Sequence, residues 1–338
     1  MQSSILRQAL ALLLVVFFLS PQANACDVCA LYTAVQVESP IENALRLGIA
    51  EQFTSFDRLQ RDGHFVSNTE NQFLKSSVTQ LSAQYDPSTT TSLQLVLPVV
   101  SRTWRRIQEG SPQRGSNAGI GDITLLAHYV PMNYAEGNTL ARLRVFAGVE
   151  LPTGDAHYLG EETAPDHHEE SQQALTQKHG GVVQGPSAEN AIHGHDITLG
   201  SGSWDFPLGA GLFTQWDKFI FATDVQYTIR TEGSFSYKYA NDLIWSTAVG
   251  RYLYLEDNAQ IALRARLSGQ YKDMDTGKGG VEYTDTAYNT TFLGPEISTL
   301  VAQQWQGVFG LDLPINVKNS DLQITPSYRI RAALSDRF

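Results

Sequence analysis

The sequence predicts an all-β protein, a transmembrane antiparallel β-barrel of about 12 strands in up-and-down order. Runs of about ten residues alternate between apolar and polar side chains, as strands do when successive side chains face lipid and lumen in turn. The connections between these runs alternate between short and long. An apolar leader at the start of the chain is too short to cross a bilayer as a helix. These three observations favour an exported barrel.

The first 25 residues have the pattern of a cleaved export signal. A basic residue, Arg7, precedes the 11 apolar residues Ala9–Leu19, and the small residues Ala23 and Ala25 mark a signal-peptidase site. A helix needs about 20 apolar residues to span a bilayer. We therefore predict a signal peptide over residues 1–25.

The rest of the chain is predicted to consist of a periplasmic N-terminal segment, residues 26–43, and the barrel, residues 44–338. No later stretch has the 18 consecutive apolar residues of a transmembrane helix. Loss of Arg7 with the signal takes the formal charge from −11 to −12, and this acidic balance argues against nucleic acid as a partner. An exported barrel belongs in the outer membrane of a Gram-negative bacterium, with outer-membrane lipid and the barrel-assembly machinery as partners.

Ala141–Leu151 shows the alternation most clearly. Its odd-numbered residues are apolar, whereas Arg142, Arg144 and Glu150 lie on the other face. A soluble antiparallel sandwich alternates in the same way, so alternation alone does not decide between the two folds. The twelve predicted strands lie near residues 44–56, 73–85, 91–103, 120–130, 140–151, 199–215, 219–231, 239–253, 258–271, 288–302, 305–315 and 322–338.

The lengths of the connections favour the barrel. Short connections alternate with mostly long ones, which are residues 57–72, 104–119, 152–198, 232–238 and 272–287. Outer-membrane barrels have short periplasmic turns and longer extracellular loops, and an even strand count returns both ends to one side. The segment 152–198 is therefore predicted to be a long extracellular loop. Aromatic residues near strand ends, as in interfacial girdles, are Phe53, Phe56, Trp104, Trp204, Phe206, Trp216, Phe219, Tyr252, Tyr254 and Trp305.

The chain ends at Phe338, on the same face as Leu334, Ala332 and Ile330. Bacterial barrel proteins commonly end in an aromatic residue, because the assembly machinery reads the last strand. We therefore predict that Phe338 is an assembly signal.

Three glycine-rich motifs follow one another in the predicted barrel: Gly119–Asp122, Gly148–Asp155 and Leu199–Asp205. In this order they resemble motifs of the outer-membrane proteins of the phenol-degradation MetA-pathway family. The resemblance implies a barrel for the uptake or passage of small molecules, which in some members are aromatic compounds. The residues themselves also suit a structural role, because Pro152 and Gly154 end a strand.

Arginines recur on the face opposite the apolar residues, with fewer carboxylates among them. This pattern predicts a polar lumen that attracts anions, and thus a transporter or channel for small solutes. The alternative is a non-conducting barrel in which arginines and carboxylates pair and fill the interior. The predicted pore-lining residues are Arg142, Arg144, Arg230, Arg264, Arg266, Arg329, Arg331 and Glu150, and Arg251 is assigned to the same face.

The predicted loop 152–198 holds six of the eight histidines of the chain among many carboxylates. Imidazole and carboxylate bind divalent zinc, copper or nickel. A metal site is therefore one interpretation, with His167, His168, His193 and His195 as ligands. A solvated surface loop is the other, because such tracts are compositional evidence only.

Cys26 and Cys29 are the two cysteines of the chain. Export places them in an oxidising compartment, which favours a disulfide. A redox or metal-binding pair and a lipid-modified Cys26 are the alternatives.

Among enzymes, an outer-membrane hydrolase is the rival hypothesis, but the sequence has no Gly-x-Ser-x-Gly or His-Glu-x-x-His motif. The sequence thus favours a protein that is not an enzyme.

Overall fold

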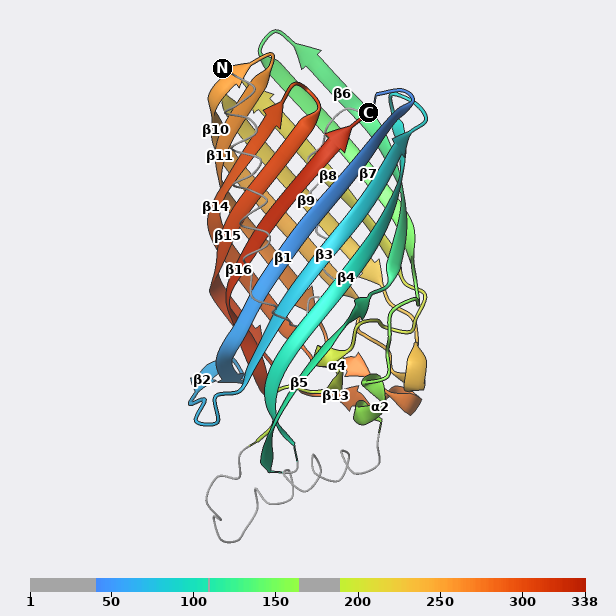
Figure 1. The fold of residues 1–338 in the computed structure, drawn as a ribbon, viewed down its shortest axis with the longest axis vertical. Coiled ribbons are helices and arrows are strands. Elements are labelled where there is room, and N and C mark those ends of the chain that lie inside the picture. The colour runs from blue at the N-terminus through green and yellow to red at the C-terminus, as the bar shows by residue number, and fades with distance from the viewer. Residues whose placement is uncertain (1–40, 109, 164–188) are drawn as a thin grey trace.

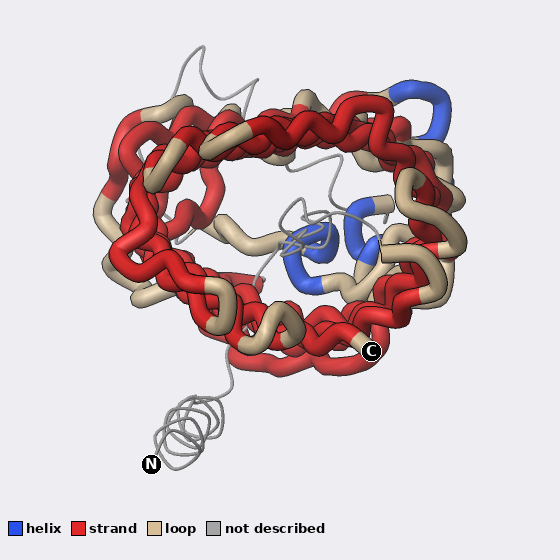
Figure 2. The backbone as a smooth tube through the Cα atoms, turned by 90° about the horizontal axis from the view of Figure 1, so that it is seen from above, coloured by secondary structure: helices blue, strands red, loops and turns tan. Residues whose placement is uncertain are grey.

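The computed structural model describes residues 41–108, 110–163 and 189–338. They form a closed antiparallel barrel of 12 strands, in which each strand pairs with its neighbour in the chain and the last strand pairs with the first (Figures 1 and 2). The predicted fold is confirmed. The strands of the wall are β1 (Ala44–Arg61), β3 (Phe73–Asp86), β4 (Thr91–Gln108), β6 (Ile123–Glu136), β7 (Thr139–Leu151), β8 (Phe206–Trp216), β9 (Phe219–Ile229), β10 (Asp242–Glu256), β11 (Ala259–Lys272), β14 (Tyr288–Val301), β15 (Trp305–Asn319) and β16 (Leu322–Arg337).

The two ends of the barrel differ. One end, the turn end, carries tight turns and the closing pair Arg46–Arg337 between β1 and β16. The other end, the loop end, carries the short elements (Figure 1). These are β2 (His64–Val66), β5 (Ser111–Ile120), β12 (Asp275–Thr276), β13 (Glu282–Tyr283), α2 (Leu159–Glu162), α4 (Gly194–Ile197), η1 (Ser234–Ser236) and η2 (Lys278–Gly280). Among the described residues, no helix is long and apolar enough to cross a membrane.

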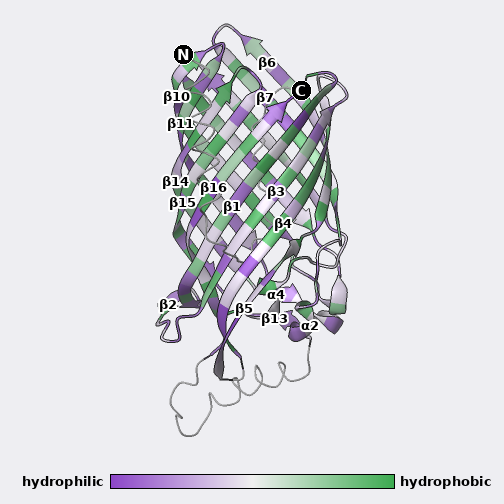
Figure 3. Cartoon of the chain, viewed as in Figure 1, coloured by the Kyte–Doolittle hydropathy of each residue, from purple (hydrophilic) through white to green (hydrophobic). Residues whose placement is uncertain are grey.

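Side chains alternate between the inside and the outside of the wall, because successive residues of a strand point to opposite faces. In β4, Leu93 and Leu95 are exposed on the outside, whereas Ser92 and Gln94 are buried inside. The bands of opposite hydropathy along the strands in Figure 3 have this origin. Glu51 of β1 is an exception, because it lies in the outward row between the buried residues Ala50 and Gln52.

The wall is shorter on one side. β4 pairs with β5 over residues 99–108 and with β6 over residues 91–96. The strand structure is interrupted between β5 and β6, at Gly121–Asp122. β7 ends at Leu151, opposite the first residue of β6. As a result, β8 and β9 have 11 residues each, whereas β1 and β4 have 18. The segments 152–163 and 189–205 lie at the loop end beside this low wall (Figure 1).

Several details differ from the sequence predictions. Residues 111–120 form a strand and not part of a loop, and the predicted strand 199–215 begins only at Phe206. Trp104 was expected in an outer girdle, but it is buried inside the barrel, against the backbone of Gly115 and the ring of Tyr158. Its position in the inward row of β4 follows from the strand register, which the local sequence does not reveal.

Candidate functional site

The predicted pore-lining arginines lie on the inside of the barrel. Arg142 and Arg144 come from β7, Arg264 and Arg266 from β11, and Arg329 and Arg331 from β16, so each pair is two residues apart and shares a face. All except Arg266 are buried, and the side chain of Arg266 is 21% exposed. Arg251 was assigned to this face, but it is exposed, and it lies over the outward ring of Phe219.

Glu296 of β14 is the centre of one ion cluster. Its carboxylate accepts from Arg264 at 2.6 Å and from Arg331 at 2.7 Å, and Arg266 lies 3.6 Å away. Arg331 also donates to Asp312 of β15 through Nε, at 2.7 Å. Three guanidinium groups thus share two carboxylates, and the cluster has a net positive charge.

Arg230 forms the opposite kind of cluster. It follows β9 and donates to Glu150, Asp205 and Asp242, each at 2.8 Å. Because all four side chains are buried and joined to one another, Arg230 and Glu150 stabilise the wall where β7 meets the returning chain. Their sequence assignment as pore-lining residues remains a prediction.

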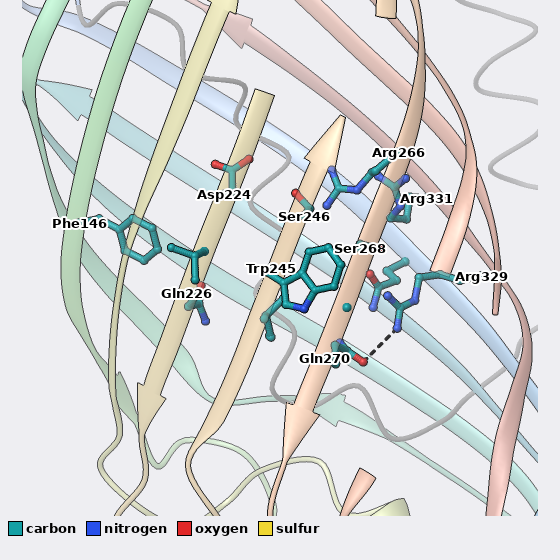
Figure 4. Close-up of a pocket in the computed structure, with 14 residues that line it drawn as sticks. Phe146, Asp224, Gln226, Trp245, Ser246, Arg266, Ser268, Gln270, Arg329 and Arg331 are labelled. Carbon is teal, nitrogen blue, oxygen red and sulfur yellow. Dashed lines mark hydrogen bonds between the residues drawn. The ribbon is translucent and has the colours of Figure 1, made fainter. Parts of the chain in front are cut away.

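A cavity in the middle of the barrel lies against the Glu296 cluster (Figure 4). Its empty space of about 570 Å³ is continuous with the open lumen. Its charged residues are Arg266, Arg329, Arg331 and Asp224. The guanidinium of Arg329 lies 4.1 Å from the ring centroid of Phe292 and donates to Gln270 at 3.3 Å. Three guanidinium groups against one carboxylate make this cavity suited to anions.

The remaining polar groups that line this cavity are neutral. They are Gln52, Gln226, Ser246, Ser268 and Gln270. Amides and hydroxyls both donate and accept hydrogen bonds, so they can replace part of the hydration of a passing solute.

A second cavity leads from the first toward the loop end. The two cavities share Gln270 and Arg329, and the second one also has Lys272, His195 and Asp196 in its wall. Of these groups, Lys272 pairs with Asp275 at 2.7 Å and His195 with Glu162 at 3.0 Å, so the charges of the second cavity are largely compensated.

Asp122 holds together the two described parts of the connection between β7 and β8, residues 152–163 and 189–205, in the mouth of the barrel. Its carboxylate accepts from the backbone N–H of Gly154 at 2.8 Å, and from the backbone N–H and hydroxyl of Ser201 at 2.7 and 2.8 Å. Asp122 belongs to the first glycine-rich motif, Gly154 to the second and Ser201 to the third. The three motifs thus meet in space, and here they have a structural role.

Apolar contacts hold the same connection from inside. Ile192 and Ile197 are fully buried with Leu59, Leu74 and Trp104. Arg102 donates to the carbonyl oxygens of Asp196 and Thr198, and Arg106 pairs with Glu161 at 2.7 Å. Figure 2 shows helical segments inside the ring of strands, and another that lies outside it. The described ends of the segment 152–198 therefore narrow the barrel mouth from within.

Two of the four predicted metal ligands come together in this region. His193 pairs with Asp285 at 2.7 Å, and His195 pairs with Glu162 at 3.0 Å. Burial lowers the pKa of both imidazoles, but the facing carboxylates outweigh it, and the pKa rises to about 9 for His193 and about 10 for His195. His167 and His168 lie outside the described residues, as do Cys26, Cys29 and the predicted signal peptide.

Sequence reasoning missed Asp122, Glu162 and Asp285. Asp122 had a signal, because it ends one of the motifs. Glu162 had the composition of the segment 152–198, which also holds its partner His195, whereas Asp285 had no signal, because its partner His193 lies far away in the chain.

Comparison with models of protein families gives no match, and comparison with curated protein sequences gives none either. Among solved structures, the chain is similar to an outer membrane channel from Pseudomonas putida F1, with a TM-score of 0.60, 17% identity, and coverage of 89% of this chain and 97% of that chain. The beta domain of the Bordetella autotransporter BrkA has a TM-score of 0.45 at 11% identity, covering 87% of this chain and 99% of that one. The monoaromatic hydrocarbon channel CymD has a TM-score of 0.35 at 10% identity, covering 88% of this chain and 88% of that one.

The likeness to the Pseudomonas channel shows a shared fold. It agrees with the outer-membrane barrel that the three motifs led us to expect. The two lower TM-scores add no argument about function.

Proposed function

We propose that the protein is an outer-membrane channel through which small anionic solutes diffuse. The observation that carries this proposal is the central cavity, which three arginines and one aspartate line. An excess of fixed positive charge in a narrow, low-dielectric passage attracts anions and repels cations. In the wall of the second cavity, Lys272 pairs with Asp275 at 2.7 Å, so the preference for anions rests on the central cavity.

The same channel function places the protein in the outer membrane. The leader over residues 1–25 directs export, and the barrel lies in the outer membrane of a Gram-negative bacterium after insertion by the barrel-assembly machinery. Both chain ends then lie in the periplasm, and the loop end faces the medium. The apolar outer face of the barrel, with exposed residues such as Leu93 and Leu95, suits contact with outer-membrane lipid.

Catalysis is the weaker hypothesis. Hydrolysis by a serine needs an imidazole or similar base beside the hydroxyl. The buried Ser201 and Ser203 instead donate to Asp122 and Asp205. These contacts stabilise the connection, and we propose no enzymatic activity.

Reversal potentials in planar bilayers test the channel. In a salt gradient, the wild type should prefer anions, and Arg266→Glu should shift the preference toward cations. Arg251→Glu is the matched control, because it makes the same charge change on the outside of the barrel, and it should leave the selectivity unchanged. Conductance that is absent, or selectivity that responds equally to both changes, would contradict the proposal and favour the non-conducting barrel.

A further inference from the structure

Among the described residues, His193, His195 and Asp196 form the one group whose ligand atoms converge as metal ligands do. One ligand atom from each lies within 4.8 Å of the other two. His195 is buried, and the other two side chains are 22% and 18% exposed. The imidazole rings are nearly parallel, with centroids 5.8 Å apart. We propose that these three residues bind one divalent transition-metal ion, of the zinc, copper or nickel class, at the loop end of the lumen.

The spacing of two ligand atoms already fits a bound ion. His195 Nε2 lies 3.5 Å from Asp196 Oδ1. In a tetrahedral site with bonds of about 2.0–2.1 Å, two ligand atoms are about 3.3–3.4 Å apart. An ion can therefore bind between them with small side-chain movements. Three protein ligands leave a fourth position for water or a solute anion.

Carboxylates orient both imidazoles in the way that metal-binding histidines require. Nδ1 of His195 faces Glu162 at 3.0 Å, and Nδ1 of His193 faces Asp285 at 2.7 Å. A histidine ligand usually donates its other ring N–H to a carboxylate, which fixes the tautomer and makes the ligating nitrogen more basic. In both residues this leaves Nε2 as the ligand nitrogen.

The backbone around the ligands is held in place before any ion binds. The second carboxylate oxygen of Asp196 accepts from the backbone N–H of His193 at 2.9 Å. The carbonyl of His195 accepts from the hydroxyl of Tyr239 at 3.3 Å, and Arg102 donates to the carbonyl of Asp196 at 2.8 Å. A preorganised site loses little conformational entropy on binding.

Charge and access also suit a cation. Three carboxylates, on Glu162, Asp196 and Asp285, surround the two imidazoles. The same carboxylates that favour a proton on each imidazole favour one divalent ion in place of the two protons. His195 and Asp196 border the second cavity, which provides a path for the ion. Imidazole with one carboxylate matches zinc, copper and nickel better than calcium or magnesium.

Such an ion would add to the ion pairs, and to the packing of Tyr283 against the cluster that includes Ala156 and Leu159, that already join two segments. Glu162 ends α2, whereas Asp285 lies between β13 and β14. With the ion bound, both carboxylates would hold its imidazole ligands from behind. The site would thus fasten the inward-folded connection to the segment between β13 and β14.

Calorimetric titration of ZnCl2 into the full chain, refolded in detergent, tests the proposal. The wild type should bind one tightly held zinc ion, and His193→Ala/His195→Ala should weaken this binding by about 100-fold or more. Two controls should retain it: His157→Ala, whose exposed ring pairs with Asp155 in the same connection, and His167→Ala/His168→Ala. Cobalt(II) should give the visible absorption of a tetrahedral site in the wild type and in both controls.

Two further variants separate ligation from folding. Asp196→Asn should remove the cobalt band while the barrel keeps its heat-modifiable migration on gels. Glu162→Gln should weaken zinc binding by about 10–100-fold, because it only orients His195. Zinc binding that survives in His193→Ala/His195→Ala, or that is lost in His167→Ala/His168→Ala, would overturn the proposal, as would a wild type that binds no zinc. None of these results depends on whether the barrel conducts.

Discussion

Arg331 holds Asp312 with two parallel hydrogen bonds, from Nε at 2.7 Å and from Nη2 at 2.9 Å. The guanidinium reaches across from β16 to β15, and its remaining nitrogen, Nη1, donates to Glu296 of β14. One arginine thus connects the inner faces of three neighbouring strands near the closing seam of the barrel. Arg331 compensates Asp312 and Arg264 compensates Glu296, so the excess positive charge of the Glu296 cluster falls on Arg266, which lies 3.6 Å from Glu296.

Asp312→Asn should lower the stability of the barrel and raise its preference for anions. The change removes one of the two carboxylates that compensate Arg331, and loss of one partner of a buried ion pair costs about 3 kcal/mol. Urea unfolding in detergent and reversal potentials measure the two effects. Asp257→Asn, at an exposed turn, is the control and should change neither. Unchanged stability would mean that water in the lumen already screens the pair.

Asp122→Ala should loosen the mouth of the barrel without unfolding the wall. It removes the acceptor of three hydrogen bonds that tie Gly154 and Ser201, while β6 and β7 keep their own ladder. We expect faster amide exchange in residues 152–163 and 189–205 and a larger single-channel conductance. Asp155→Ala is the matched control, because the Asp155 carboxylate interacts with the backbone N–H and the ring of its neighbour His157 and does not tie distant segments together. An equal conductance in all three proteins would show that this connection does not limit the pore.

The local sequence predicted the wall of the barrel well, because each strand carries its own alternating pattern. Leu93 and Leu95 face outward and Gln94 inward as the pattern requires, and the strand order follows from the short turns. The interior was harder to predict. Leu199, Ser201 and Ser203 look like an extension of the next strand, but all three are buried in the mouth of the barrel, where Asp122 from a distant motif accepts from Ser201.

The contacts of His193 and His195 were also hard to predict, because their partners are distant in the sequence. Composition predicted that His193 and His195 bind metal, but it offered four histidines of one loop as the ligands. In the structure, the carboxylates beside the two imidazoles are Glu162, 33 residues before His195, and Asp285, in another connection. Contacts over such distances depend on the closure of the barrel, and no local pattern encodes them.

Glu51→Gln should stabilise the barrel in a bilayer. Glu51 lies in the outward row of β1, and its two carboxylate oxygens accept from the hydroxyls of Ser77 and Thr79, both at 2.5 Å. A carboxylate on the lipid face is unfavourable, whereas the amide oxygen of glutamine still accepts a hydrogen bond. We expect the free energy of unfolding in lipid vesicles to rise by about 1 kcal/mol. Glu256→Gln, at the exposed turn end of β10, should have no effect. A fall in stability would indicate that the charge at residue 51 has a partner in the membrane.

Phe338 should be required for assembly through its side chain more than through its backbone. Its N–H donates to the carbonyl of Leu45 at 2.8 Å, and its carbonyl accepts from the N–H of Leu45 at 3.1 Å, so the residue extends the seam between β1 and β16. Deletion removes both these bonds and the ring, whereas Phe338→Ala removes the ring alone. If the assembly machinery reads the aromatic ring, both variants should be exported and yet give little heat-modifiable barrel in the outer membrane.

Phe65→Ala provides the matched control, because Phe65 and Phe338 are both 65% exposed and Phe65 lies at the loop end. It should assemble at the wild-type level. Both purified Phe338 variants should still refold in detergent, since two hydrogen bonds at an exposed strand end contribute only about 1 kcal/mol each. Normal assembly of Phe338→Ala with poor assembly of the deletion would assign the effect to the seam and remove the evidence for a terminal signal. Poor refolding of both in detergent would instead make Phe338 a residue of barrel stability.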